Sequence, residues 1–176
     1  MSIVNLAGLS VTEASFKRAR RIVDEKPAGS VRTANDVLAS LRKMMPGWTI
    51  TTSSEEWTEG FRNIEIDPDI LRQMAEDPDV MTAYKALILD IAETAPEIEA
   101  WGKQNAGQLL EFGVTLEADG SVTAMMIVRT LMGGEVSTTF NLPEDRGSWS
   151  DIIRERLDAL AQGQVEDAYG TRSWIA

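Results

Sequence analysis

Hydrophobic and polar positions along this chain follow two periods, one typical of helices and one typical of strands. Residues 34–45 place apolar side chains at the i, i+1, i+4, i+7 and i+8 spacing of one buried helix face, and Pro46-Gly47 ends that helix. Residues 48–52 and 63–67 alternate with a period of two instead. We therefore predict two neighbouring strands there, in antiparallel orientation.

Two Asp-Pro steps follow the second of these strands and predict where helices begin. Asp67 and Asp77 each precede a proline. An Asp side chain accepts hydrogen bonds from the unpaired amides of a first helical turn, and Pro fits the first helical position. The apolar spacing then predicts a short helix from residue 68 and a longer one from residue 78, interrupted near Pro96.

The strongest strand pattern lies between residues 112 and 142. Asp119-Gly120 predicts a hairpin turn between strands at 112–117 and 122–131, and residues 135–142 alternate again. A last helix is predicted after the cap at 148–151. The fold class that follows is α+β, with a mostly antiparallel sheet of about five strands and helices packed on one face.

The start of the chain reads differently from the rest. Ser10 to Glu13 has the pattern of a helix N-cap, a weak apolar stripe extends the predicted helix from residue 11 to residue 25, and residues 26–30 then interrupt it. We expect residues 1–30 to form a basic helical segment that is mobile or depends on a partner. The remaining predicted units are an α+β core domain at 31–165 and a C-terminal tail at 166–176.

The Asp-Pro region also carries a resemblance. The motif Ile66-Asp67-Pro68-x-x-Leu71-x-x-Met74-Ala75-x-Asp77-Pro78, followed by a helix containing Tyr84 and an Asp-Gly hairpin, resembles a group of short bacterial proteins catalogued only as a domain of unknown function. The resemblance covers about residues 33–131. It implies boundaries and a fold, and it brings no reaction, cofactor or catalytic residue.

Composition limits the chemistry more than any motif does. The 176 residues include no histidine and no cysteine, which excludes Ser-His-Asp and Cys-His nucleophile pairs and the usual zinc sites. We expect no cofactor, no catalytic residue and no metal-binding residue. No apolar run is long enough to cross a membrane, and the first residues do not read as a secretory signal, so we expect a cytoplasmic protein.

Charge is distributed unevenly along the chain. Residues 1–47 carry eight basic and four acidic residues, whereas the whole chain has a net charge of −11. Such an acidic body disfavours nucleic acid, and a basic helix beside it suits contacts between proteins. We predict a protein partner or self-association, no nucleic acid and no membrane contact. The predicted interaction surface consists of Arg18, Arg20, Arg21, Trp57 and Phe61.

Carboxylates supply the remaining candidate sites. Asp67, Asp69, Asp77 and Asp79 have the spacing of oxygen ligands, but helix capping explains them more simply. Glu111, Glu117 and Asp119 flank the predicted hairpin, where a pair on adjacent strands could act as acid and base. Glu55, Glu56 and Glu59 lie near Trp57 and Phe61, a combination that could bind a sugar or a basic peptide.

The leading functional hypothesis is a non-enzymatic protein-interaction or assembly module. The alternative is a carboxylate-based or divalent-cation-dependent hydrolase. A second alternative, an exported accessory of a flagellar-type secretion apparatus, depends on the uncharged opening at residues 1–9.

Overall fold

The computed structural model describes residues 2–22, 32–105, 109–129, 133–145, 149–162, 164–166 and 172–174. The helices are α1 (Glu13–Arg21), α2 (Ala34–Met44), the short 3-10 helix η1 (Ser54–Glu56), α3 (Pro68–Glu76), α4 (Pro78–Gln104) and α5 (Trp149–Ala161). The strands are β1 (Ile3–Leu6), β2 (Leu9–Thr12), β3 (Thr49–Thr51), β4 (Gly60–Ile66), β5 (Leu109–Leu116), β6 (Val122–Arg129), β7 (Glu135–Leu142), β8 (Gln164–Glu166) and β9 (Arg172–Trp174).

The Asp-Pro steps begin helices as predicted. An Asp67 carboxylate oxygen accepts a hydrogen bond from the Asp69 amide at 2.7 Å, and an Asp77 oxygen accepts one from the Asp79 amide at 2.8 Å. The predicted interruption at Pro96 is wrong, because α4 continues through it to Gln104. Pro96 is exposed, and the buried residues Ile98 and Trp101 on the other side of the helix hold the last turns against the core.

The α+β class and the sheet are confirmed, but the sheet is mixed. Its strand order is β3-β4-β5-β6-β7. The β5-β6 and β6-β7 pairs are antiparallel, whereas β4 pairs in parallel with both β3 and β5, so the antiparallel orientation predicted for the first two strands is wrong. Because β3 has only three residues and spans about 10 Å, residues 52–59 are long enough to carry the chain back for a parallel pairing.

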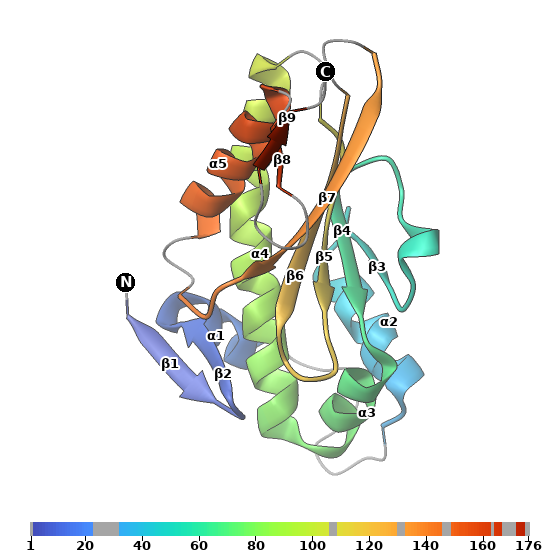
Figure 1. Ribbon diagram of the computed structural model, residues 1–176. Coiled ribbons are helices and arrows are strands. Elements are labelled where there is room, and N and C mark those ends of the chain that lie inside the picture. Colours follow the sequence, from blue (N-terminus) through green and yellow to red (C-terminus); the bar gives the residue numbers. More distant parts are fainter. Residues whose placement is uncertain are drawn as a thin grey trace.

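The elements form layers around α4 (Figure 1). The sheet lies on one side of α4, and the β1-β2 hairpin with α1 lies on the other. Between Met81 and Ile91 every α4 residue is buried except the partly exposed Thr82. A helix that is buried all round needs a cover on each side, so the N-terminal layer belongs to the core of this fold.

The N-terminal segment is therefore more than a basic helix. Residues 3–12 form a hairpin that the sequence pattern did not predict, and only Glu13–Arg21 is helical in the described part of this segment. Thr12 donates from its amide and its hydroxyl to the buried Asp90 of α4, at 3.0 and 2.6 Å. The predicted interruption at 26–30 and most of the 166–176 tail lie outside the described residues, and the three predicted domain boundaries stay predictions.

Candidate functional site

One face of the five-stranded sheet is the candidate site. On the face that packs against helices, Ile64, Val114 and Ala124 form a buried row across three strands. Side chains alternate between the two faces of a strand, so their neighbours point the other way. We call that second side the open face. It includes Thr49, Asn63, Glu65, Glu111, Gly113, Thr115, Thr123, Met125, Ile127, Ser137, Thr139 and Asn141.

Trp57 lies on the open face over the central strand β5. A Cβ atom built on Gly113 would lie 2.3 Å from both Cη2 and Cζ3 of the indole, so only glycine allows this contact. Trp57 is partly exposed, yet its Nε1 is buried and has no hydrogen-bond partner among the residues that the structure describes. The ring thus occupies the space that a side chain at residue 113 would fill.

A buried asparagine holds the connection that carries Trp57. Asn63 is 1% exposed, and its Oδ1 accepts a hydrogen bond from the Thr58 amide at 3.0 Å. Its Nδ2 donates to the Thr58 carbonyl at 2.9 Å and to the Phe112 carbonyl at 3.1 Å. The sequence pattern places Asn63 at the start of a strand and gives no sign of this role. The role depends on three segments that are separate in the sequence, which contribute Thr58, Asn63 and Phe112.

Two pairs of carboxylates lie on or beside the open face. Burial raises the pKa of Glu65, and the neighbouring Glu117 raises it further. Burial likewise raises the pKa of Glu111, with a further contribution from Glu59. None of these four carboxylates has an ion pair with a basic side chain in the described ranges.

The carboxylates singled out around the hairpin are not brought together. Glu111 and Glu117 belong to different pairs, six residues apart on one strand and its end. Asp119 instead serves the turn: its Oδ1 accepts a hydrogen bond from the Ser121 amide at 2.9 Å. Hydrogen bonds from the side chain and then the backbone of Ser121 lower the pKa of Asp119. Gly120 follows with a φ of 84°, as an Asp-Gly hairpin requires.

The five residues predicted as an interaction surface lie in three places. Arg18, Arg20 and Arg21 are exposed on α1, across α4 from the sheet (Figure 1). Phe61 packs against Gly102 of α4, on the helix side of the sheet, whereas Trp57 lies on the open face. They do not form one continuous surface, and whether any of them binds a partner stays a prediction.

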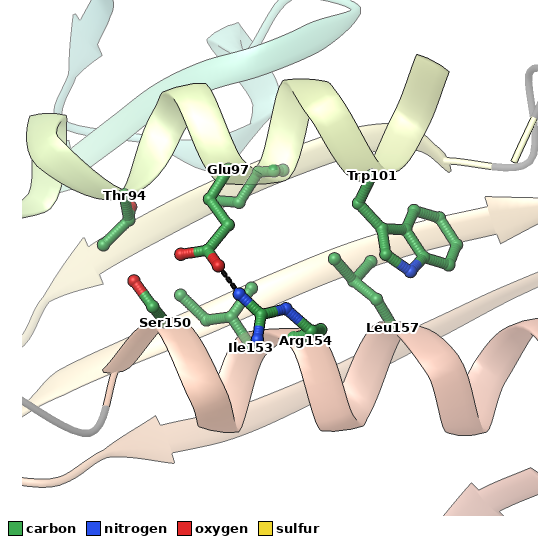
Figure 2. Close-up of a pocket in the computed structure, with 8 residues that line it drawn as sticks. Thr94, Glu97, Trp101, Ser150, Ile153, Arg154 and Leu157 are labelled. Atoms are coloured by element: carbon green, nitrogen blue, oxygen red, sulfur yellow. Dashed lines mark ion pairs between the residues drawn. The ribbon is translucent and has the colours of Figure 1, made fainter. Parts of the chain in front are cut away.

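The contact between α4 and α5 encloses a small cavity (Figure 2). Glu97 and Arg154 form an ion pair across it, and Trp101 Nε1 donates to Asp158 at 2.8 Å beside it. Its volume is about 10 Å³, room for no more than one water. This cavity is a seam between packed helices rather than a ligand site.

A larger hollow of about 500 Å³ lies at the end of the sheet where β4 begins. Phe61, Arg62, Glu99 and Lys103 line it, and Arg62 donates to Glu99 at 2.8 Å. The guanidinium and the carboxylate neutralise each other, and the lining favours no single ligand chemistry.

The described ranges contain neither a cluster of metal-ligating side chains nor a helix that could span a membrane. No group of three or more acidic side chains in the described ranges is placed to hold a metal ion. No described helix is long and apolar enough to span a bilayer.

The fold and the site define an α+β domain with a mixed sheet, whose α-helices in the described ranges pack on the other side from the open face. Residues 53–138 match the family described as "Protein of unknown function (DUF6033)". This confirms the resemblance to an uncharacterised family, and the match includes Trp57, the Asp-Pro steps and the hairpin. No curated protein and no solved structure matches the chain.

Proposed function

We propose that this protein is a non-enzymatic interaction module that binds an extended basic segment of another protein on its open face. The observation that carries the proposal is the arrangement around Trp57. Met125 lies directly opposite Gly113 in the sheet and Ile127 opposite Glu111, both partly exposed, between the two carboxylate pairs. The open face therefore has an apolar centre and charged margins, a combination that is typical of protein-binding surfaces.

Electrostatics favour a basic occupant. Burial is the main reason that the pKa values of Glu65 and Glu111 are raised, and the like charges of Glu117 and Glu59 raise them further by making ionisation less favourable. A Lys or Arg placed between the members of a pair would reverse that effect. Its aliphatic stem would pack on Met125 or Ile127 while its charged end reached the carboxylates.

Geometry favours an extended occupant. The open face is a row of strands whose outward side chains repeat every second residue, about 7 Å apart along a strand. A partner segment in the same conformation has the same repeat, so alternate side chains meet successive rows of the face. The basic helix α1 of this chain lies on the far side of α4 and does not neutralise the open face.

Calorimetric titration with an octapeptide of alternating Lys and Val tests the proposal. We expect binding that weakens with salt, and about tenfold weaker binding after Glu65→Gln with Glu111→Gln, corresponding to about 1.4 kcal/mol. Glu76→Gln with Glu155→Gln is the matched control, since both side chains are exposed on helices and the change in net charge is the same. Equal loss in both variants, or no binding at all, would contradict the proposal.

A second candidate function is hydrolysis by a carboxylate pair. The observation that favours it is Glu65, whose raised pKa beside Glu117 suits a general acid next to a charged partner. Turnover of chromogenic glycosides that is lost in Glu65→Gln but kept in Glu76→Gln would support hydrolysis in place of the binding function.

A further inference from the structure

One edge of the outer strand β7 is unpaired in the part of the chain that the structure describes. Among the described strands, β7 pairs only with β6, in an unbroken register from Glu135 opposite Arg129 to Leu142 opposite Val122. In such a strand every second residue directs its N–H and C=O groups away from the paired neighbour. No backbone hydrogen bond joins these groups to another described element. From this edge and the strand's sequence we propose that a second copy of this chain pairs with β7, antiparallel and centred on Thr138.

The β7 edge lacks the usual protection against pairing. Natural sheets protect their edges with short strands, lysines, prolines or bulges. The opposite edge strand β3 is only three residues long, which is one of these devices. By contrast, β7 has eight residues, no lysine, no proline and no irregularity in its register. Its single charged side chain, Glu135, lies at one end and is 3.6 Å from Arg129.

The sequence of β7 is complementary to itself in antiparallel orientation. With Thr138 on the two-fold axis, Val136 lies opposite Phe140 of the second copy, and Ser137 lies opposite its Thr139. Side chains with even numbers lie on the helix side and those with odd numbers on the open face. Apolar side chains therefore meet apolar ones, and hydroxyls meet hydroxyls.

Charge and register also favour this pairing. Glu135 would face the neutral Asn141 of the second copy, so two strongly acidic chains meet along an uncharged strip. Moving the axis to Thr139 would set Glu135 opposite Pro143, which has no N–H to donate, and Thr138 opposite Phe140. Both copies would use the same strand for the contact, as a two-fold symmetric dimer requires.

Disulfide cross-linking tests the pairing and its register together. The chain has no cysteine, so an introduced thiol has no competitor. Ser137 and Thr139 are both exposed. Directly opposite Cα atoms in an antiparallel pair are about 4.5–5.5 Å apart, within the range that a disulfide spans. Two copies of one variant would place their thiols two positions out of register, with Cα atoms roughly 8 Å apart and out of reach.

We expect a mixture of Ser137→Cys and size-tagged Thr139→Cys chains to form the mixed disulfide much faster than either variant cross-links with itself. Thr138→Lys would place two ammonium groups opposite each other, so it should shift sedimentation toward the monomer and slow the mixed cross-link. Gln73→Lys is the control, because it adds the same charge on the exposed side of α3. Cross-linking no faster in the mixture, or a monomer at every protein concentration, would overturn the proposal.

Discussion

The contact between Trp57 and Gly113 gives the sharpest prediction, because it should reverse the sign of one substitution. Gly113→Ala would place a methyl group 2.3 Å from two ring atoms of Trp57. No Cβ contact of that length exists in proteins, and the indole would have to leave the open face. Thr58, the next residue along the chain, is held by two hydrogen bonds to Asn63, which resist that movement.

Two numbers set the expected magnitude. Overpacking of this kind costs about 1–3 kcal/mol of the free energy of unfolding. When Trp57→Ala has already emptied the space, the same Gly113→Ala change should instead stabilise the protein by about 0.5–1 kcal/mol, since glycine is unfavourable inside a strand. The substitution is therefore destabilising with the tryptophan present and stabilising without it.

Urea unfolding of four proteins measures this coupling: the wild type, Gly113→Ala, Trp57→Ala and the double variant. The difference between the two Gly113→Ala effects should be about 1.5–4 kcal/mol, obtained by combining the two ranges. If Gly113→Ala destabilises the protein equally in both backgrounds, Trp57 does not lie over β5, and our description of the open face is wrong.

Three further predictions follow from other contacts. Because the raised pKa of Glu65 means that its charged form is less favourable in the folded state, Glu65→Gln should raise the urea midpoint at neutral pH, and the gain should shrink as the pH falls to the ordinary value of 4.5. Asn63→Ala should lower stability by about 1–3 kcal/mol, because the buried Phe112 carbonyl and the backbone groups of Thr58 lose their hydrogen bonds, and limited proteolysis should then cut within residues 52–59. Asp90→Ala should cost about 1.5–3 kcal/mol in chemical unfolding, because Thr12 loses both of its hydrogen bonds to a carboxylate, whereas Thr82→Ala on the same helix should cost less.

Local features of this fold could be predicted from the sequence because their causes are local. An Asp side chain reaches the amide two residues ahead, so Asp67 and Asp77 mark helix starts whatever surrounds them. The turn at Asp119-Gly120 likewise depends on one positive φ and one side-chain hydrogen bond. In each case the residues that form the hydrogen bond lie within a few positions of each other, so the sequence pattern alone predicts the feature.

The orientation of β3 and the role of the N-terminal hairpin depend on distant partners. A strand of three residues carries no mark of the direction in which it pairs, and β1 and β2 are held by contacts with α4 that begin about 80 residues later. Propensity predicts an interruption at Pro96 because it counts the lost hydrogen bond but not the packing of Trp101. The sequence indicated Trp57 but not its surroundings, because Trp57, Gly113 and Met125 meet only after the sheet has formed.

The proposal that the open face is a binding surface is tested most directly by mapping the contact of the Lys-Val octapeptide with nuclear magnetic resonance. The five tryptophans give separate indole signals, and Trp57→Phe assigns the one that matters. We predict that the peptide shifts the Trp57 indole N–H and the amides of Thr123, Met125 and Ile127, and leaves α1 unchanged. Shifts confined to Arg18, Arg20 and Arg21 on α1, or no shifts on the open face, would contradict it.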